Sequence, residues 1–546
     1  MSAVVAAERR AGRTAPPWSW IAATALVGLA ILLQIRFGMM ADVAWLIDCD
    51  ERWLNGQVPY RDFLEINPPA SLLIYLPAVA AARALGIASE LAVSVFGFAA
   101  AGAALALSAA ILRRATSMGA AVALAAILAL VVLPGQTFAE RDHLAMILGA
   151  PFVALMLARA ERAAVATPLA LLAGLGAGLM ACVKPPYALI GLAPALYCLS
   201  RCGWRSVLAA PEGYVAAAVG AAYLASIGAF FPHYAGNVLP FLLDIYVPLR
   251  ESLATMAASP GALIFVAIGA TTLLIGSQRE LRPAAAIFLL AALGAEIAYG
   301  VQGKGWVYQA VPALMLAAVA GAAALGDTAR ERAAALAAAA FTAALALFYL
   351  RSLGLAWALG VAAGFALEAA RAWIKPDLKR LAPLALAAAV GSACGLCLIE
   401  RPLTPALEAR LAAMGPGLTL GAISEDEGLS FPLVRRVGAH WAMRSHSLIV
   451  TAAARRLMSM HPGDAVLAER LRPYIERDKT ALLADLSAQR PDALLVGPLK
   501  SKLHADLFAD PQVLAVMADY RLVEREEAPD YGAELWLRND FAPLRP

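Results

Sequence analysis

A succession of apolar runs, each near twenty residues long, fills residues 18–399 and constrains this chain more than any other feature. A helix needs about 20 apolar residues to cross the hydrocarbon core of a bilayer. Only 15% of the 546 residues are charged, whereas soluble globular proteins have about 25%. The sequence therefore predicts a mostly α-helical, polytopic membrane protein.

Thirteen runs are long enough to count as spans. They cover 18–39, 89–112, 118–135, 143–160, 166–184, 185–200, 206–231, 260–276, 283–300, 309–326, 333–350, 353–370 and 381–399. Arginine clusters lie in alternate connectors, at 113–114, 159–162, 201–205, 279–282, 330–332 and 371–380. Because basic connectors stay in the cytoplasm, we expect a cytoplasmic N-terminus, with the other set of connectors outside the membrane.

The segment 67–86 is also apolar, but we do not expect it to span. Its apolar run, 70–82, is short, contains Pro77 and is followed by Arg83. If it crossed the bilayer, every later arginine cluster would move to the outer side, against the charge rule. We expect an interfacial or re-entrant helix in the outer leaflet.

The composition changes near residue 400. Apolar runs at 418–423, 493–496 and 533–537 predict strands, and amphipathic segments at 464–475 and 479–486 predict helices. We therefore divide the chain into a membrane domain, 1–400, and a soluble α/β domain, 401–546, which has a usual domain size. An odd number of spans places the second domain on the outer side.

The sequence also argues against several functions. A net charge of +4 is too small to indicate a nucleic-acid partner, so the bilayer is the expected surrounding. The six cysteines show no disulfide framework and no metal-binding pattern. The histidines at 440, 446, 461 and 504 lack the spacing of metal ligands.

The stretch 42–69, DVAWLIDCDERWLNGQVPYRDFLEINPP, is the most polar one between the early apolar runs. Its large apolar residues recur at helical spacing up to Gly56, which predicts an amphipathic helix on the membrane surface. Solvated charges on an interfacial helix are one explanation of its acids. Their spacing and their position favour a functional one.

That spacing resembles the first outer loop of the GT-C glycosyltransferases, the superfamily of protein O-mannosyltransferases and aminoarabinose transferases. In bacterial members an Asp at the end of the first span is followed 14 residues later by Gly-x-x-Pro-Tyr-x-Asp and then by Pro-Pro. The matching residues here are Asp42, Gly56, Pro59, Tyr60, Asp62, Pro68 and Pro69. The resemblance implies a bacterial inner-membrane enzyme that transfers a hexose or pentose from a polyprenyl-phosphate donor, with the soluble domain in the periplasm.

One position departs from the family pattern. Val43 follows Asp42, where many members have a second acid. Asp48 or Asp50 would then supply a paired carboxylate or a ligand for a divalent cation, or the mechanism would use one acid. We assign no cofactor and leave a divalent cation open.

The second motif, Gly-Gln-Thr-Phe-Ala-Glu-Arg-Asp-His, fills residues 135–143. The resemblance makes Glu140 and Asp142 candidates for catalysis, with Arg141 and His143 as candidates for substrate binding. Asp142 could instead cap the following helix, for about 1 kcal/mol. A cluster this polar beside hydrocarbon exceeds what a cap requires, and it favours function.

Two lysines lie at the predicted outer ends of spans. The resemblance places Lys184, in Val-Lys-Pro-Pro-Tyr, near the donor phosphate, although it could simply snorkel to the interface. Lys304 lies between two glycines, which would let a phosphate approach closely. Trp306 and Tyr308 could stack on a sugar or anchor the chain at the interface.

The implied chemistry needs a base for the acceptor hydroxyl and cations for the phosphate. We expect Asp42 to be the base, with Tyr60 among the substrate contacts. The cations expected around the phosphate are Lys184, Lys304, Arg61 and Arg141. The acceptor would be an envelope lipid, polysaccharide or protein. The alternative is a transporter or a lipid or polysaccharide flippase, but such proteins usually show paired halves, and this sequence shows none.

Overall fold

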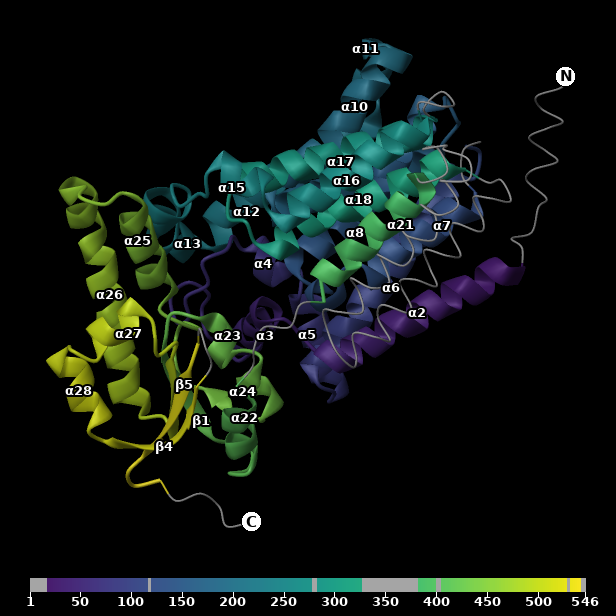
Figure 1. The fold of residues 1–546 in the computed structure, drawn as a ribbon. Coiled ribbons are helices and arrows are strands. Elements are labelled where there is room, and N and C mark those ends of the chain that lie inside the picture. The colour runs from purple at the N-terminus through teal and green to yellow at the C-terminus, as the bar shows by residue number, and fades with distance from the viewer. Residues whose placement is uncertain are drawn as a thin grey trace, which may run out of the picture. The chain divides into compact units, whose positions relative to one another are not determined.

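The computed structural model describes residues 17–115, 119–276, 282–326, 382–398, 404–527 and 531–541. The described chain is mostly helical, with one small sheet (Figure 1). It divides into two compact units. Unit 1 contains 1–38, 94–224 and 251–399, and unit 2 contains 39–93, 225–250 and 400–546.

Six helices in the described residues are long and apolar enough to cross a membrane, as in a multi-pass membrane protein. They are α2 (Pro17–Phe37), α6 (Ser89–Leu112), α8 (Arg141–Ala160), α12 (Pro211–Phe230), α17 (Pro283–Gln302) and α18 (Val307–Leu325). Each coincides with a predicted span. The mostly helical fold predicted from the apolar runs is thus confirmed.

Five further predicted spans are shorter helices. They are α7 (Ala120–Ile127), which continues as the π-helical turn η1 (Leu128–Val132), α9 (Thr167–Val183), α10 (Ala188–Cys202), α16 (Pro260–Gly276) and α21 (Ala382–Leu396). The predicted spans 333–350 and 353–370 lie outside the described residues. The total of thirteen spans and the orientation in the membrane stay predictions.

Unit 1 is a bundle centred on α8 and α18, which are buried along most of their length. Helices α16, α17 and α18 lie side by side in it (Figure 1). Small residues allow the close approach: a Cβ on Gly176 would overlap the carbonyl oxygen of Leu148, and one on Gly294 would overlap that of Leu189. Because α8 begins at Arg141, the second motif leads into a central helix of the bundle.

Unit 2 begins with α3 (Ala41–Leu54), as predicted from its amphipathic spacing. The helix ends before Gly56, whose φ of +93° favours glycine. The segment 67–86 forms two short helices, α4 (Ala70–Leu73) and α5 (Leu76–Leu85), which together do not make one continuous span. The segment from 225 to 250 contributes α13 (Pro232–Asn237), α14 (Leu239–Phe241) and the π-helical turn η4 (Leu242–Tyr246).

The C-terminal part of unit 2 is built on a five-stranded sheet in the order β2-β1-β3-β5-β4, flanked by helices (Figure 1). Strands β1 (Thr419–Ser424), β2 (His440–Trp441) and β3 (Ala493–Gly497) are parallel, whereas β5 (Ala533–Arg538) is antiparallel to β3 and to β4 (Tyr520–Glu526). The three predicted strands are confirmed. The helices are α22 (Pro405–Ala412), α23 (Glu427–Ser430), α24 (Leu433–Arg436), α25 (Ile449–Met460), α26 (Ala465–Gln489), α27 (Lys502–Leu507) and α28 (Pro511–Met517).

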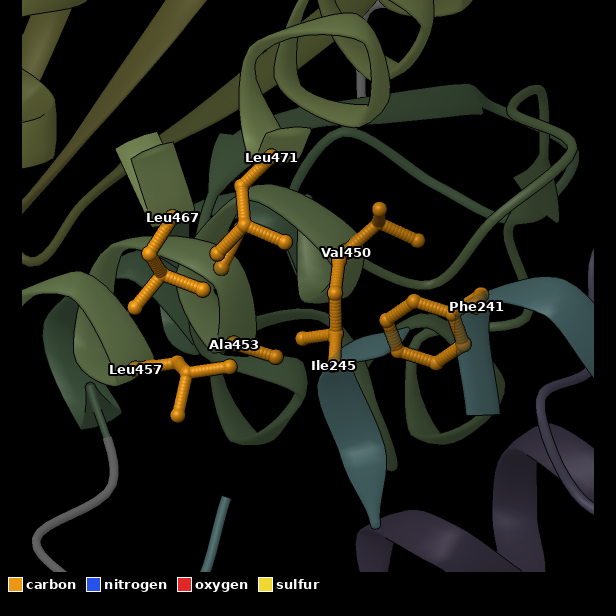
Figure 2. Close-up of a cluster of buried hydrophobic side chains, with 8 residues drawn as sticks. Phe241, Ile245, Val450, Ala453, Leu457, Leu467 and Leu471 are labelled. Atoms are coloured by element: carbon orange, nitrogen blue, oxygen red, sulfur yellow. The ribbon is translucent and has the colours of Figure 1, made fainter. Parts of the chain in front are cut away.

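A hydrophobic cluster joins the segment 225–250 to the C-terminal part of unit 2. Phe241 and Ile245 lie against Val450 of α25, next to apolar side chains of α26 (Figure 2). The Tyr474 hydroxyl also donates a hydrogen bond of 2.6 Å to Asp244. Removal of these apolar groups from water favours a single body made of distant segments.

Candidate functional site

Asp142 is the centre of a buried polar cluster in unit 1. Its backbone N–H donates to the Glu140 carboxylate at 2.6 Å, so Glu140 caps α8. The fully buried side chain of Asp142 is therefore available for other contacts. It forms an ion pair with Lys184 and accepts a hydrogen bond from the Tyr187 hydroxyl.

Lys184 is positioned by the two prolines that follow it. A residue before proline is restricted to extended backbone, and Lys184 has φ −143° and ψ 103°, which ends α9 at Val183. Its side chain is only 14% exposed. The ammonium nitrogen pairs with Asp142 and lies 5.0 Å from the centre of the Tyr308 ring, within reach of a cation–π interaction.

The loop from Gly303 to Trp306 lies at the same end of unit 1. Gly303 ends α17 with φ +65°, and its carbonyl accepts a hydrogen bond of 2.8 Å from the backbone of Glu251. Lys304 is buried, with 9% exposure. Trp306 occupies the N-cap position of α18, and its ring centre lies 5.6 Å from that of Tyr308, the residue that contacts Lys184. The structure thus brings the loops of both candidate lysines together.

The other two residues of the second motif have contacts within unit 1. Arg141 Nε lies 3.2 Å from Glu140 Oε1. His143 Nδ1 accepts from the backbone N–H of Ala139 at 2.9 Å, and Nε2 lies 2.8 Å from the carbonyl of Leu130, which assigns the proton to Nε2. We therefore assign His143 to the support of the loop rather than to substrate.

Asp42, Tyr60 and Arg61 lie in unit 2. Asp42 is half-buried in the first turn of α3. Tyr60 is buried, and its hydroxyl donates to the carbonyl of Asn67 at 2.9 Å. Arg61 is 54% exposed and forms two hydrogen bonds of 2.8 Å with Asp62. Tyr60 and Arg61 thus stabilise the turn of the first motif.

The two acids considered as complements of Asp42 differ in their surroundings. Asp48 pairs with Arg52 at 2.6 Å. Asp50 is fully buried, and neither carboxyl oxygen has a hydrogen-bond partner among the described residues. Burial, together with the charges of Glu51 and Glu65, raises the pKa of Asp50 to about 9, so this side chain is neutral near pH 7.

Sequence reasoning missed two polar residues, one beside Trp45 in unit 2 and one beside Asp142 in unit 1. Glu65 accepts from the Trp45 indole N–H at 2.8 Å and from the backbone N–H of Asn67 at 2.7 Å. Tyr187 contacts Asp142, and its place after Lys-Pro-Pro was the available signal. No group of three potential metal ligands occurs in the part of the chain that the structure describes.

Comparison with known proteins shows no family. No family model matches the chain, and no curated protein or solved structure is significantly similar to it. The likeness of residues 42–69 to GT-C glycosyltransferases therefore stays a prediction.

We expect the Asp142–Lys184 pair to be needed for stability. Lys184→Gln removes the cation from a buried carboxylate, which should cost about 3 kcal/mol, whereas adding Asp142→Asn should restore much of the loss because no charge is left unpaired. Thermal unfolding in detergent measures both, with the exposed Lys502→Gln as control. A double variant whose loss equals the sum of the single losses would contradict this coupling.

Asp50 should make stability depend on pH. The folded protein keeps the Asp50 proton up to a pKa of about 9, while the unfolded chain loses it near 3.8, so rising pH between these values favours unfolding. The slope is at most about 1.4 kcal/mol per pH unit. The melting temperature of Asp50→Asn relative to that of the wild type should therefore rise from about pH 6 to about pH 8. The exposed Asp519→Asn is the control. Parallel pH profiles of wild type and Asp50→Asn would exclude this explanation.

Proposed function

We propose that the chain is a membrane glycosyltransferase that moves a sugar from a polyprenyl-phosphate donor to an envelope acceptor. The observation that carries the proposal is the cation of Lys184, which is 14% exposed and held between Asp142 and Tyr308 at the ends of membrane helices. The motif of residues 42–69 supports the same reaction class. By the charge rule, the reaction takes place on the periplasmic face of the inner membrane.

Transfer from a lipid-linked phosphate requires cations at the leaving group. The phosphate is already a stable anion, so stabilising its developing charge matters more than protonating it. An ammonium group has three N–H donors, and Asp142 occupies one of those of Lys184. Asp142 balances the charge of Lys184 while no donor is bound, and Lys304 provides a second cation, which is buried, nearby in the same unit.

The acceptor hydroxyl needs a group that takes its proton. Asp42 is our candidate, because it stands at the acidic position of the family pattern and is half-buried on a regular helix. A carboxylate in such a place is held in position by the helix backbone. Glu140 is the helix cap, and Asp142 is the counterion of Lys184, so both are positioning residues in this proposal. Asp50, beside Glu51 on the same helix, is neutral near pH 7 and is the alternative acid.

A transporter is the second candidate, and one observation favours it. Glu296 is half-buried in the apolar helix α17, and its Oε2 has no hydrogen-bond partner within the described residues. Ionisable groups inside membrane helices often mark proton or substrate pathways. The two functions separate in detergent, where a transferase still forms product but a transporter has no gradient to use.

We expect Asp42→Asn to lower sugar transfer by about a hundredfold to ten-thousandfold, the usual contribution of a general base. Lys304→Gln should lower it about tenfold or more, with partial recovery in Lys304→Arg, because the charge is restored. Each variant is expressed in a strain that lacks the protein, and envelope lipids and polysaccharides are profiled by mass spectrometry.

The control is Lys502→Gln, an exposed lysine of α27. Melting temperatures of all variants separate loss of transfer from loss of folding. If the strain without the protein has the same envelope glycans as the parent, the proposed function is wrong. Normal transfer by Asp42→Asn would remove only the base from the mechanism.

A further inference from the structure

A cavity of about 600 Å³ lies in unit 1 where α8 and α10 end and α12 begins. Its polar side includes Arg159, Arg162 and Ser206, and its apolar side includes Phe152 and Met156. The volume is within the range of small-molecule sites, about 300 to 1,000 Å³. The ligand suited to this lining has one charged end and one apolar end.

The two arginines of the cavity have different tasks. Arg159 forms hydrogen bonds of 3.0 and 3.1 Å with the buried carboxylate of Glu212, so its charge is balanced. Arg162 is exposed and donates one hydrogen bond, of 3.0 Å, to the carbonyl of Arg201. A carbonyl does not balance a guanidinium charge, and most of the five N–H donors of Arg162 stay available to an anion.

The backbone of Arg162 indicates that its side chain matters. Its φ is +55°, in the left-handed region that costs a non-glycine residue about 1 kcal/mol or more. Glycine would fit this position better. A ligand bound by the guanidinium at the cavity would explain why an arginine occupies this strained position.

Next to the cavity, the short helix α11 (Trp204–Leu208) has the character of a membrane interface. Ser206 and Val207 line the cavity, while Trp204 is 60% exposed and Leu208 is 60% exposed. Tryptophan is enriched at the level of lipid headgroups. Arginine clusters flank the cavity in sequence at 159–162 and 201–205, the arrangement of the cytoplasmic side.

We propose that this cavity binds the phosphate headgroup of an anionic phospholipid, with Arg162 as the main cation and Phe152 and Met156 against the apolar part. Basic pockets between membrane helices suit such headgroups. A free phosphate would leave the apolar wall without a partner. Arg159 follows Asp142 by 17 residues on α8, about 25 Å along the helix axis, so this site is separate from the cluster of the proposed function and does not depend on it.

The test uses the full-length protein in nanodiscs of phosphatidylcholine alone or with phosphatidylglycerol of the same acyl chains. Native mass spectrometry of the released protein should show retained phosphatidylglycerol. Arg162→Gly should reduce that retention about tenfold, the effect of one lost charged hydrogen bond, without lowering the melting temperature, because the backbone strain is relieved. Arg162→Lys should retain more lipid than Arg162→Gly, because the charge is kept. Arg114→Gly, in another arginine connector, should retain lipid like the wild type.

Cys202 locates the bound lipid. It lines the cavity and is partly exposed, whereas the other five cysteines are buried. Phosphatidylglycerol should slow its reaction with N-ethylmaleimide several-fold, and this protection should be lost in Arg162→Gly. Equal reaction rates in both kinds of nanodisc would overturn the proposal. Displacement of the lipid by inorganic phosphate would also overturn it, because the site would then select a free anion.

Discussion

Unit 2 depends on the burial of Trp45. This side chain lies on α3, is 1% exposed, and packs edge-on against Phe431 at 5.4 Å and His446 at 5.3 Å. Its indole N–H donates to Glu65 at 2.8 Å, which satisfies the polar end of the ring. Truncation of a buried tryptophan typically costs about 3 to 5 kcal/mol. Trp45 of α3 thus links the start of unit 2 to its C-terminal part.

Charged groups around Trp45 fix the orientation of α3. Arg435 forms hydrogen bonds of 2.9 Å with both carboxylate oxygens of Glu51 and also pairs with Glu90. Burial raises the pKa of Glu51, but the hydrogen bonds and charge of Arg435 outweigh it and keep that pKa below its usual value. Arg52 adds hydrogen bonds of 3.0 and 2.6 Å to the carbonyls of Met443 and Trp441. Many charges of the first motif therefore stabilise unit 2. The proposed chemistry rests on Asp42, and Asp50 has no hydrogen-bond partner among the described residues.

Local patterns in the sequence predict the long apolar helices, α3 and three of the five strands, but not shorter helices such as α13, α22 and α25. Apolar runs gave α16 and α17 nearly to the residue, and β1, β3 and β5 follow from short apolar runs. Strand β2 has two residues, and β4 has a single buried residue, so neither has a hydrophobic signal. The packing of η4 against α25 is a long-range contact that no local period reveals.

The candidate site could be predicted in composition but not in detail. Asp142 and Lys184 were both identified, yet their ion pair depends on the packing of α8 against α9. The sequence offers Asp142 as the helix cap, but Glu140 takes that place: its backbone is extended, with ψ 155°, and its side chain accepts the hydrogen bond. The buried Asp50 looked like the other acids of its loop, because burial is a tertiary property.

Unit 2 is one body assembled on α3. Hydrogen–deuterium exchange of the wild type and Trp45→Ala measures this dependence, with Trp20→Ala, 67% exposed on α2, as the control. Because amides of one cooperative body open together, we expect Trp45→Ala to lose protection in 39–93 and in the strands β1 and β3. Wild-type protection of β1 and β3 in Trp45→Ala would contradict the claim.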